Sequence, residues 1–466
     1  MDENNIWKNG SFNGLSFDET VKKYIQYQPK ENATEKKIED FKANDDGKNF
    51  SWVLDSDRGY LNINDSNRSI DWGIPNQVIG NPDTANVFLC LLNPRTRNDT
   101  SECSNLKKYI DLENKNNGEF FNSIDEYKTH IINDKENILN QEALRLSGRK
   151  LKPSEYFDVL IPKIKDYIDE HIRLGTYTIT ETSWETLGKK FVLTDDFKII
   201  INREFNEMVN NNDKNVLIAK TDNKNELISD KLKCAISDEI KKWINTYNRL
   251  RSKKTSKKVS EKLLNKRLEE KLKSKIEAEL DPLNDAYYFK EYYSSLLMKN
   301  TSLNKRDYLD SIYSNGNKFE LLKICDLELL PYRTIDEHGI KFNDNAKYRD
   351  LISSRYVASL IIKRIKKYEI QYDRYESKLK KSDLEKCKDK EPIKPIFIFR
   401  SYSHWEETIK YCLKHEGNDM KLNEVYETLE ENYFYRFPNA KGTITPGNIK
   451  KVRLPQDEFT EIRKKL

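Results

Sequence analysis

Residues 87–95, VFLCLLNPR, give the clearest indication of the fold of this chain. A short apolar run closed by Asn-Pro is typical of a strand that is buried on both faces of a sheet. Pro94 has no amide hydrogen to offer a neighbouring strand, so we expect the strand to end there. Open α/β sheets bind their ligands beyond the carboxyl ends of their strands, which makes Asn93, Pro94 and Arg95 candidate site residues.

Three further apolar runs end in a similar way: ICDLELLPY (324–332), PIFIFR (395–400) and NYFYRFPNAKG (432–442). Segments 353–368, 404–414 and 456–466 are predicted helices, and Ser353 is a candidate N-cap for the first. Such strand–helix alternation predicts right-handed crossovers and a parallel sheet. The sequence therefore predicts an α/β fold with a four-stranded parallel sheet flanked by helices. We expect WGIPNQVIGNP (72–82) to be an approach loop and residues 369–394 to be a Lys-rich linker.

A long insertion separates the first predicted strand from the second. Loops of that length without structure of their own are uncommon. Segments 156–172, 227–250 and 259–280 have the apolar spacing of helices, and residues 176–180 and 190–201 resemble a small strand pair. We therefore predict that residues 1–98 and 321–466 build the α/β core, and that residues 99–320 form an inserted, mainly helical domain.

Composition indicates a soluble, cytoplasmic protein. The 466 residues are 34% charged and 36% hydrophobic, carry a net charge of +5, and include six cysteines without a CxxC pair. A disulfide framework is not expected in a chain of this size, and no His stands at zinc-ligand spacing from these cysteines. We expect reduced thiols, with Cys90 and Cys325 in the core, and neither a metal nor another cofactor. The first residues do not form a signal peptide, and no segment reaches the about 18 apolar residues of a membrane helix.

Two basic clusters are candidate contacts to nucleic acid, because phosphate binding requires a local concentration of Lys and Arg. The second lies on the predicted helix 353–368. For the first, the alternative is a solvated connection between helices, since acidic residues follow it closely. The first cluster comprises Arg249, Arg251, Lys253, Lys254, Lys257 and Lys258, and the second includes Lys363 and Arg364.

The ordered set of four strand ends resembles the uracil-DNA glycosylase superfamily. GNPDTANVFLCLLNPR (80–95) resembles its first motif, in which a buried strand delivers a short polar loop to the base. DLELLPY (326–332) resembles its second strand, and PIFIFRSYSHW (395–405) its third strand with the following helix. YRFPNAKG (435–442) falls where the family has a loop that presses into the DNA minor groove. The resemblance covers residues 75–98 and 321–466, and it implies DNA as the partner, an N-glycosidic hydrolase as the activity and no cofactor.

This resemblance assigns roles to particular residues. Asn93 is the candidate catalytic residue, because its side-chain carbonyl can position an attacking water. An amide is a weak proton acceptor, so catalysis would depend on stabilisation of the departing nucleobase, and Asp99 is the candidate that could supply a carboxylate instead. Each candidate also has a structural interpretation, as a turn, sheet-end, ion-pair or helix-start residue. The candidates for substrate binding are Pro94, Arg95, Tyr332 for stacking, Arg400 for phosphate or a base carbonyl, His404 for acid–base chemistry, and Asn439.

Two interpretations of function stay open. The first is a DNA-binding, glycosylase-like enzyme that excises a modified base from foreign DNA in phage defence. The second is a catalytically inactive binding or sensor protein of the same fold, which contacts a protein partner through the helical insertion. Two departures from the family pattern favour the second: Arg95 replaces a small glycine and Phe437 replaces the signature histidine. A nuclease or toxin of another lineage is disfavoured, because the sequence contains no recognisable carboxylate–lysine metal site, Walker loop, HExxH or GxSxG motif.

Overall fold

The chain divides into two compact units. The first, which we call the sheet unit, comprises residues 1–143, 288–305 and 315–466, and the second comprises residues 144–287 and 306–314. The predicted domain limits at residues 98 and 320 stay a prediction. The computed structural model describes residues 5–27, 50–64, 67–96, 103, 105–110, 124–133, 135–147, 239, 242, 243, 246, 257–279, 281, 283, 286–298, 302–313, 319, 321–335, 340–379, 390–415, 421–438, 443–445, 447–449 and 458–466.

A five-stranded, mostly parallel sheet forms the centre of the sheet unit. In spatial order its strands are β3 (Val78–Gly80), β5 (Ile324–Glu328), β4 (Val87–Leu91), β6 (Ile396–Phe399) and β7 (Phe434–Arg436). The pairs β4–β5, β4–β6 and β6–β7 are parallel. The predicted set of four parallel strands is therefore confirmed, including the adjacency of β4 and β5, which are far apart in the sequence.

The edge strand β3 corrects the prediction of a loop at residues 72–82. It pairs antiparallel with β5. Gly80 has a φ of 104°, and a Cβ atom there would lie 2.5 Å from the carbonyl oxygen of Ile324. Glycine thus allows the edge strand to approach β5. The Gly and Pro residues on both sides of this three-residue strand conceal it from an analysis of sequence pattern.

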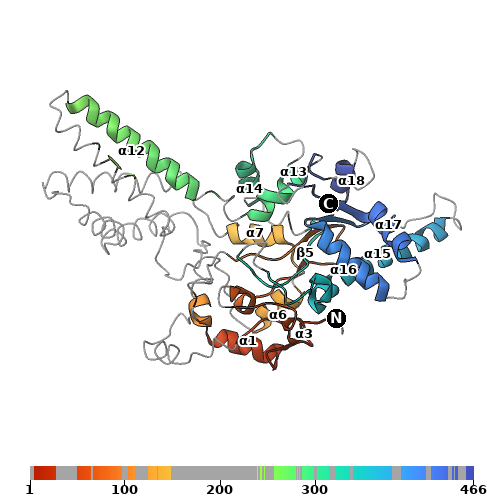
Figure 1. Ribbon diagram of the computed structural model, residues 1–466. Helices are drawn as coiled ribbons and strands as arrows, with labels where there is room; N and C mark the ends of the chain where they lie inside the picture. The colour runs from red at the N-terminus through yellow and green to blue at the C-terminus, as the bar shows by residue number, and fades with distance from the viewer. Residues whose placement is uncertain are drawn as a thin grey trace. The chain divides into compact units, whose positions relative to one another are not determined.

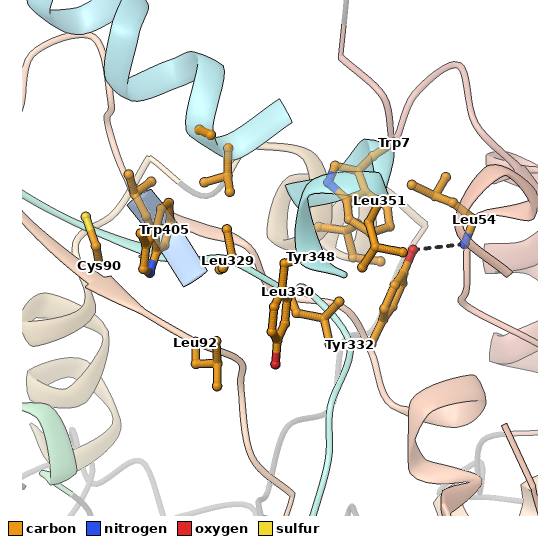
Figure 2. Close-up of a cluster of buried hydrophobic side chains, with 14 of the residues drawn as sticks. Trp7, Leu54, Cys90, Leu92, Leu329, Leu330, Tyr332, Tyr348, Leu351 and Trp405 are labelled. Carbon is orange, nitrogen blue, oxygen red and sulfur yellow. Dashed lines mark hydrogen bonds between the residues drawn. The ribbon is translucent and has the colours of Figure 1, made fainter. Parts of the chain in front are cut away.

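One face of the sheet, which we call the core face, packs against helices. Figure 1 shows α15 (Ile352–Leu379) and α16 (Tyr402–His415) beside the strands, and both helices supply buried residues to the same cluster as the strands. Trp405 of α16 is fully buried, and its Nε1 atom donates to the carbonyl oxygen of Leu91 at 3.0 Å; Figure 2 shows Trp405 and Cys90 in this cluster. The predicted burial of Cys90 and Cys325 is confirmed. The strand residues on the core face are Phe88, Cys90, Cys325, Leu327, Phe397, Phe399 and Phe434.

Aromatic residues from the N-terminal segment extend this core. Trp7 and Trp52 are almost completely buried, and the ring of Trp7 meets Tyr332 edge-on at 6.3 Å. A capping box between Ser16 and Glu19 closes the start of the first long helix. The elements of this segment are β1 (Ser11–Phe12), β2 (Leu15–Ser16), α1 (Phe17–Gln26), α3 (Asp55–Arg58) and α4 (Ser69–Trp72), followed by α6 (Ile124–Asn133).

α15 begins and ends at other residues than the sequence predicts. It continues to Leu379, so the first part of the expected linker 369–394 is helical. Ser353 lies inside the first turn rather than at the N-cap. Asp57 caps this helix from another part of the chain, since its Oδ1 atom accepts from the amide of Ile352 at 2.6 Å. The hydroxyl of Tyr332 donates to the other Asp57 oxygen at 2.8 Å, and this pair joins the start of α15 to the segment after β5.

The opposite face of the sheet, which we call the acidic face, carries Asp326 and Glu328 of β5. Arg463 donates to the carbonyl of Leu296 at 2.8 Å, and Figure 1 shows their two helices close together. The predicted helices at 404–414 and 456–466 are confirmed by α16 and α18. The elements on this side and at the end of the chain are α7 (Ile138–Ser147), the π-helix η5 (Phe289–Tyr293), α13 (Ser294–Leu297), α17 (Leu422–Tyr433) and α18 (Glu458–Lys464).

The second unit is described in part. α12 (Lys257–Glu279) confirms the helix predicted at 259–280, and α14 (Lys305–Tyr313) also contributes to this unit. The predicted elements at 156–172, 176–180 and 190–201, and most of 227–250, lie outside the described residues. None of the helices described in either unit has the length and apolar character that crossing a membrane requires.

Candidate functional site

A row of side chains crosses four strands at the carboxyl edge of the acidic face. Glu328, the last residue of β5, is in register with Leu91 of β4. Cys90 pairs with Phe399, so Arg400 follows β6 at the level of Leu91. Phe437 follows β7 at the same level, and its amide donates to the carbonyl of Phe399. Residues in register share a face of a sheet, so Glu328 and Arg400 lie on either side of Leu91.

The Asn93 side chain is held in one orientation just beyond β4. Its Nδ2 atom donates to the backbone carbonyl of Pro94 at 3.2 Å and to the Thr334 hydroxyl at 2.5 Å. The backbone carbonyl oxygen of Pro94 can only accept a hydrogen bond, so the Asn93 side-chain atom that contacts it must be the amide nitrogen and not the amide oxygen. Asn93 is 8% exposed, and among the described residues its Oδ1 atom has no hydrogen-bond partner. Asn93 therefore presents one buried acceptor at the carboxyl edge.

Glu328 is a buried acid beside three arginines. It is 3% exposed, and within the described part of the chain its Oε2 atom has no hydrogen-bond partner. Burial raises its pKa well above the ordinary value, and Asp326 on the same strand adds to the rise. The positive charges of Arg400, Arg333 and Arg95 oppose this rise in pKa. We refer to Asn93, Arg95, Glu328, Arg333 and Arg400 together as the carboxyl-edge site.

The three arginines are positioned in different ways. Arg333 is 8% exposed, and it donates to the carbonyls of Ile74 at 3.0 Å and Arg95 at 3.1 Å, so it holds two loops together. The side chain of Arg95 is exposed. Arg400 donates to the hydroxyl of Tyr292 at 2.8 Å. Exposure leaves Arg95 accessible to a ligand, whereas Arg333 has a structural function in the loops.

Backbone strain and a π-helix occur beside Arg400. Ser401 has a φ of 56°, a left-handed conformation that residues with a side chain seldom adopt. It makes the turn from β6 into α16. η5 presents consecutive tyrosines to the acidic face, since Tyr292 contacts Arg400 and Tyr293 contacts Asp326. Single-turn π-helices often occur at functional sites, and here one contacts both Arg400 and Asp326.

Asp326 lies deeper on the acidic face than Glu328. It is 1% exposed, and the hydroxyl of Tyr293 donates to its Oδ1 atom at 2.6 Å. Burial raises the pKa of Asp326 to about 8, against the effect of the Tyr293 hydrogen bond, and the Glu142 charge adds to the rise. Glu142 itself accepts from the amides of Tyr288 and Phe289 at the start of η5. Asp326 is thus protonated for the most part at neutral pH.

The other residues predicted from the sequence lie apart from this site or outside the described residues. Tyr332 is fully buried on the core-face side, and its hydroxyl accepts from the amide of Leu54 at 3.2 Å, as Figure 2 shows. His404 starts α16 and packs on Tyr348 of the short helix η6 (Tyr348–Asp350), with 4.8 Å between the ring centroids. Burial of part of the imidazole lowers the pKa of His404, against the effect of Glu407. Asn439 and Asp99 are outside the described residues.

The structure describes Lys363 and Arg364 of the second basic cluster, but only part of the first cluster. Arg364 is 7% exposed and donates from Nε to the carbonyl of Ala85 at 3.1 Å, near the amino end of β4, while Lys363 is exposed. This cluster therefore lies at the edge of the sheet opposite Asn93. In the first cluster, Lys257 and Lys258 begin α12, whereas Arg249, Arg251, Lys253 and Lys254 are outside the described residues. Their binding of nucleic acid stays a prediction.

Glu328 and Asp326 are buried acids of the acidic face with raised pKa values, and neither is among the site residues predicted from the sequence. A signal for them was present in ICDLELL (324–330), where two acids alternate with apolar residues in a run that reads as a buried strand. Alternation places both acids on one face. Tyr292 gave no comparable signal, because a π-turn inside a helix has no distinctive pattern. Among the described residues, no group of three His, Cys, Asp or Glu is arranged to hold a metal ion.

No family model, curated protein or solved structure matches this chain.

Proposed function

We propose that this protein is a glycosylase-like, DNA-binding enzyme that hydrolyses the N-glycosidic bond of a modified base at the carboxyl-edge site. Such an enzyme must extract a base from the stack, orient a water toward the sugar and stabilise the charge that develops. The four parallel strands bring Asn93, Arg95 and Arg400 to one edge of one sheet, and this arrangement supports the proposal. Excision of a modified base from foreign DNA in phage defence is the biological role that we propose for it.

The orientation of Asn93 is the observation that carries this proposal. Its nitrogen is engaged by Pro94 and Thr334, and its buried oxygen is left as an acceptor. A water that donates to this oxygen would direct a lone pair away from it, toward the anomeric carbon of a bound nucleotide. The product would be a free base and an abasic site. Arg95 and Arg400 supply positive charge for the neighbouring phosphates.

A release assay tests the enzymatic proposal directly. The purified protein is incubated with phage and host DNA, and abasic sites are detected with an aldehyde-reactive probe, while free bases are identified by mass spectrometry. We expect base release from at least one DNA, and Asn93→Ala should lower its rate by at least about 100-fold. The matched control is Asn86→Ala, which changes a buried asparagine at the other end of the same strand and should retain activity.

A protein without catalytic activity is the second candidate, and one observation favours it. Phe437 occupies the position at which the family resemblance places a histidine, and its ring packs on Tyr292 at 6.3 Å and is 8% exposed. An apolar residue there cannot donate a hydrogen bond to a departing base. This candidate predicts no base release from any DNA, no effect of Asn93→Ala on biological protection, and a protein that co-purifies through the second unit.

A further inference from the structure

We infer that the carboxyl-edge site binds a phosphate group between Arg95 and Arg400, and that the bound anion replaces the Glu328 carboxylate as their counter-ion while Glu328 takes up a proton from solvent. The inference deepens the proposed function and rests on it for the location of the ligand. It concerns binding alone, and it needs no bond cleavage.

The geometry places Glu328 where one anion can substitute for another. Glu328 and Arg400 flank Leu91 on one face of the sheet, and Arg95 follows the same strand as Leu91. Arg400 is directed by its hydrogen bond to Tyr292. Arg95 is exposed, so a ligand can approach it from solvent, whereas Glu328 is 3% exposed and acts on the arginines through its charge from inside the protein.

The groups that face Glu328 come from every element packed around it. Burial is the largest influence and favours the uncharged acid, and the negative charge of Asp326 acts in the same direction. Only the arginines favour the ionised carboxylate. The charged and titratable neighbours are Asp326 on β5, Arg333 after β5, Arg95 after β4, Arg400 after β6, and Tyr288 before η5.

An incoming phosphate changes this balance. Its negative charge neutralises the arginines and removes the influence that favours the ionised form of Glu328. Two adjacent anions in a buried site repel each other, so protonation of Glu328 accompanies binding. By linkage, binding is strongest at low pH, where Glu328 is already neutral. Affinity then falls as pH rises through the pKa of Glu328 in the free protein, by at most about tenfold for each pH unit.

Calorimetric titration over pH tests the inference with two probes of constant charge. One is inorganic sulfate and the other is a short single-stranded oligodeoxynucleotide. For the wild type we expect affinity to fall as pH is raised from about 5 to 9, with proton uptake seen as a dependence of the binding enthalpy on the ionisation enthalpy of the buffer. Glu328→Gln should bind as tightly as the wild type does at low pH and should lose both effects.

The control variants isolate the site from general charge effects. Glu376→Gln and Arg374→Gln change charges on the distant half of α15 and should behave like the wild type. Arg400→Gln should weaken binding at every pH. Sulfate binding with proton uptake would show that the phosphate group alone is recognised, and uptake with the oligodeoxynucleotide alone would show that a strand is required; both support the inference.

Two results would overturn it: neither probe binds, or Glu328→Gln keeps the pH dependence of the wild type. These outcomes are distinct from failure of the proposed function. Proton-linked binding without base release would leave the inference valid and remove the enzyme proposal. Base release together with an unchanged pH dependence in Glu328→Gln would support the enzyme proposal and overturn the inference.

Discussion

The environment of each side chain determines its chemistry at the scale of single residues. Asp326 and Glu328 are two positions apart on β5, yet Asp326 accepts from a tyrosine hydroxyl, whereas Glu328 is under the electrostatic influence of three arginines. The two acids therefore contribute differently, Asp326 to the stability of the fold and Glu328 to the carboxyl-edge site. Asn93 gains its potential reactivity in the same way, from neighbours that occupy its nitrogen and leave its oxygen.

Asp326 predicts a specific dependence of stability on pH. Its pKa is raised from 3.8 to about 8 in the folded protein, so between these values the folded state keeps a proton that the unfolded chain has lost. The contribution of Asp326 to the free energy of unfolding is greatest below about pH 4, and it falls with rising pH by up to about 1.4 kcal/mol per pH unit. Above about pH 8 this decline ends.

Urea denaturation at a series of pH values measures this effect. Asp326→Asn keeps an oxygen that accepts from Tyr293 and cannot ionise, so its stability should change less over that range than that of the wild type. Asp373→Asn, on the exposed part of α15, should follow the wild-type profile. An Asp326→Asn profile parallel to that of the wild type would contradict the assignment.

At the scale of elements, the start of α15 depends on residues from distant parts of the chain. Asp57 accepts from the helix amide of Ile352 and from the hydroxyl of Tyr332, which is 275 residues away in sequence. The helix could be predicted from the sequence, because its apolar spacing is local. Ser353 was the predicted cap, because nothing in the local sequence indicates that a remote carboxylate closes the first turn.

Removal of this cap should destabilise the protein. Asp57→Ala leaves the buried amide of Ile352 and the hydroxyl of Tyr332 without their acceptor, and we expect a loss of about 3 kcal/mol in the free energy of unfolding. Tyr332→Phe removes one of these bonds and leaves the cap, so it should cost about 1 kcal/mol. Equal losses in both variants, measured by urea denaturation, would show that Asp57 does not cap α15.

The edge strand β3 gives a second prediction at this scale. Gly80→Ala places a methyl group against the backbone of Ile324 at a positive φ, so we expect a loss of more than about 1 kcal/mol. Gly59→Ala is the control, because Gly59 has a φ of −62° and nothing within 4 Å of the added carbon. Thermal unfolding should show a lowered midpoint for the first variant and an unchanged or slightly higher one for the second.

For the whole molecule, the sequence predicted the four parallel strands and the adjacency of the first two in the chain, β4 and β5. Each is an apolar run with a clear end, and the rules of strand connection leave few arrangements. The relation between the strands and the site was harder to predict. Tyr332 follows its strand as expected and yet lies with Trp7 in the core, since the chain after β5 turns toward that side. The sequence pattern predicts where a residue lies along its strand, but the packing of the folded chain determines which side chains reach the site.

The two edges of the sheet should respond differently to salt. If nucleic acid binds at the carboxyl edge, Arg95→Gln and Arg400→Gln should each weaken the binding of a single strand, and each should reduce its logarithmic salt dependence by roughly 0.7. Lys363→Gln, at the amino edge, should change neither quantity. Fluorescence anisotropy over a range of salt concentrations measures both. A larger effect of Lys363→Gln than of the arginine variants would assign the binding surface to the opposite edge.

The position of β4 in the middle of the sheet affects how the protein is made. Both of its neighbours, β5 and β6, come later in the chain, and even the contact between Asn93 and Thr334 spans 241 residues. A ribosome therefore releases an apolar strand long before either partner exists, and a nascent chain with an unpaired strand is prone to aggregate. During synthesis this strand has to be shielded, and we expect expression of the protein to depend on chaperones that bind such segments.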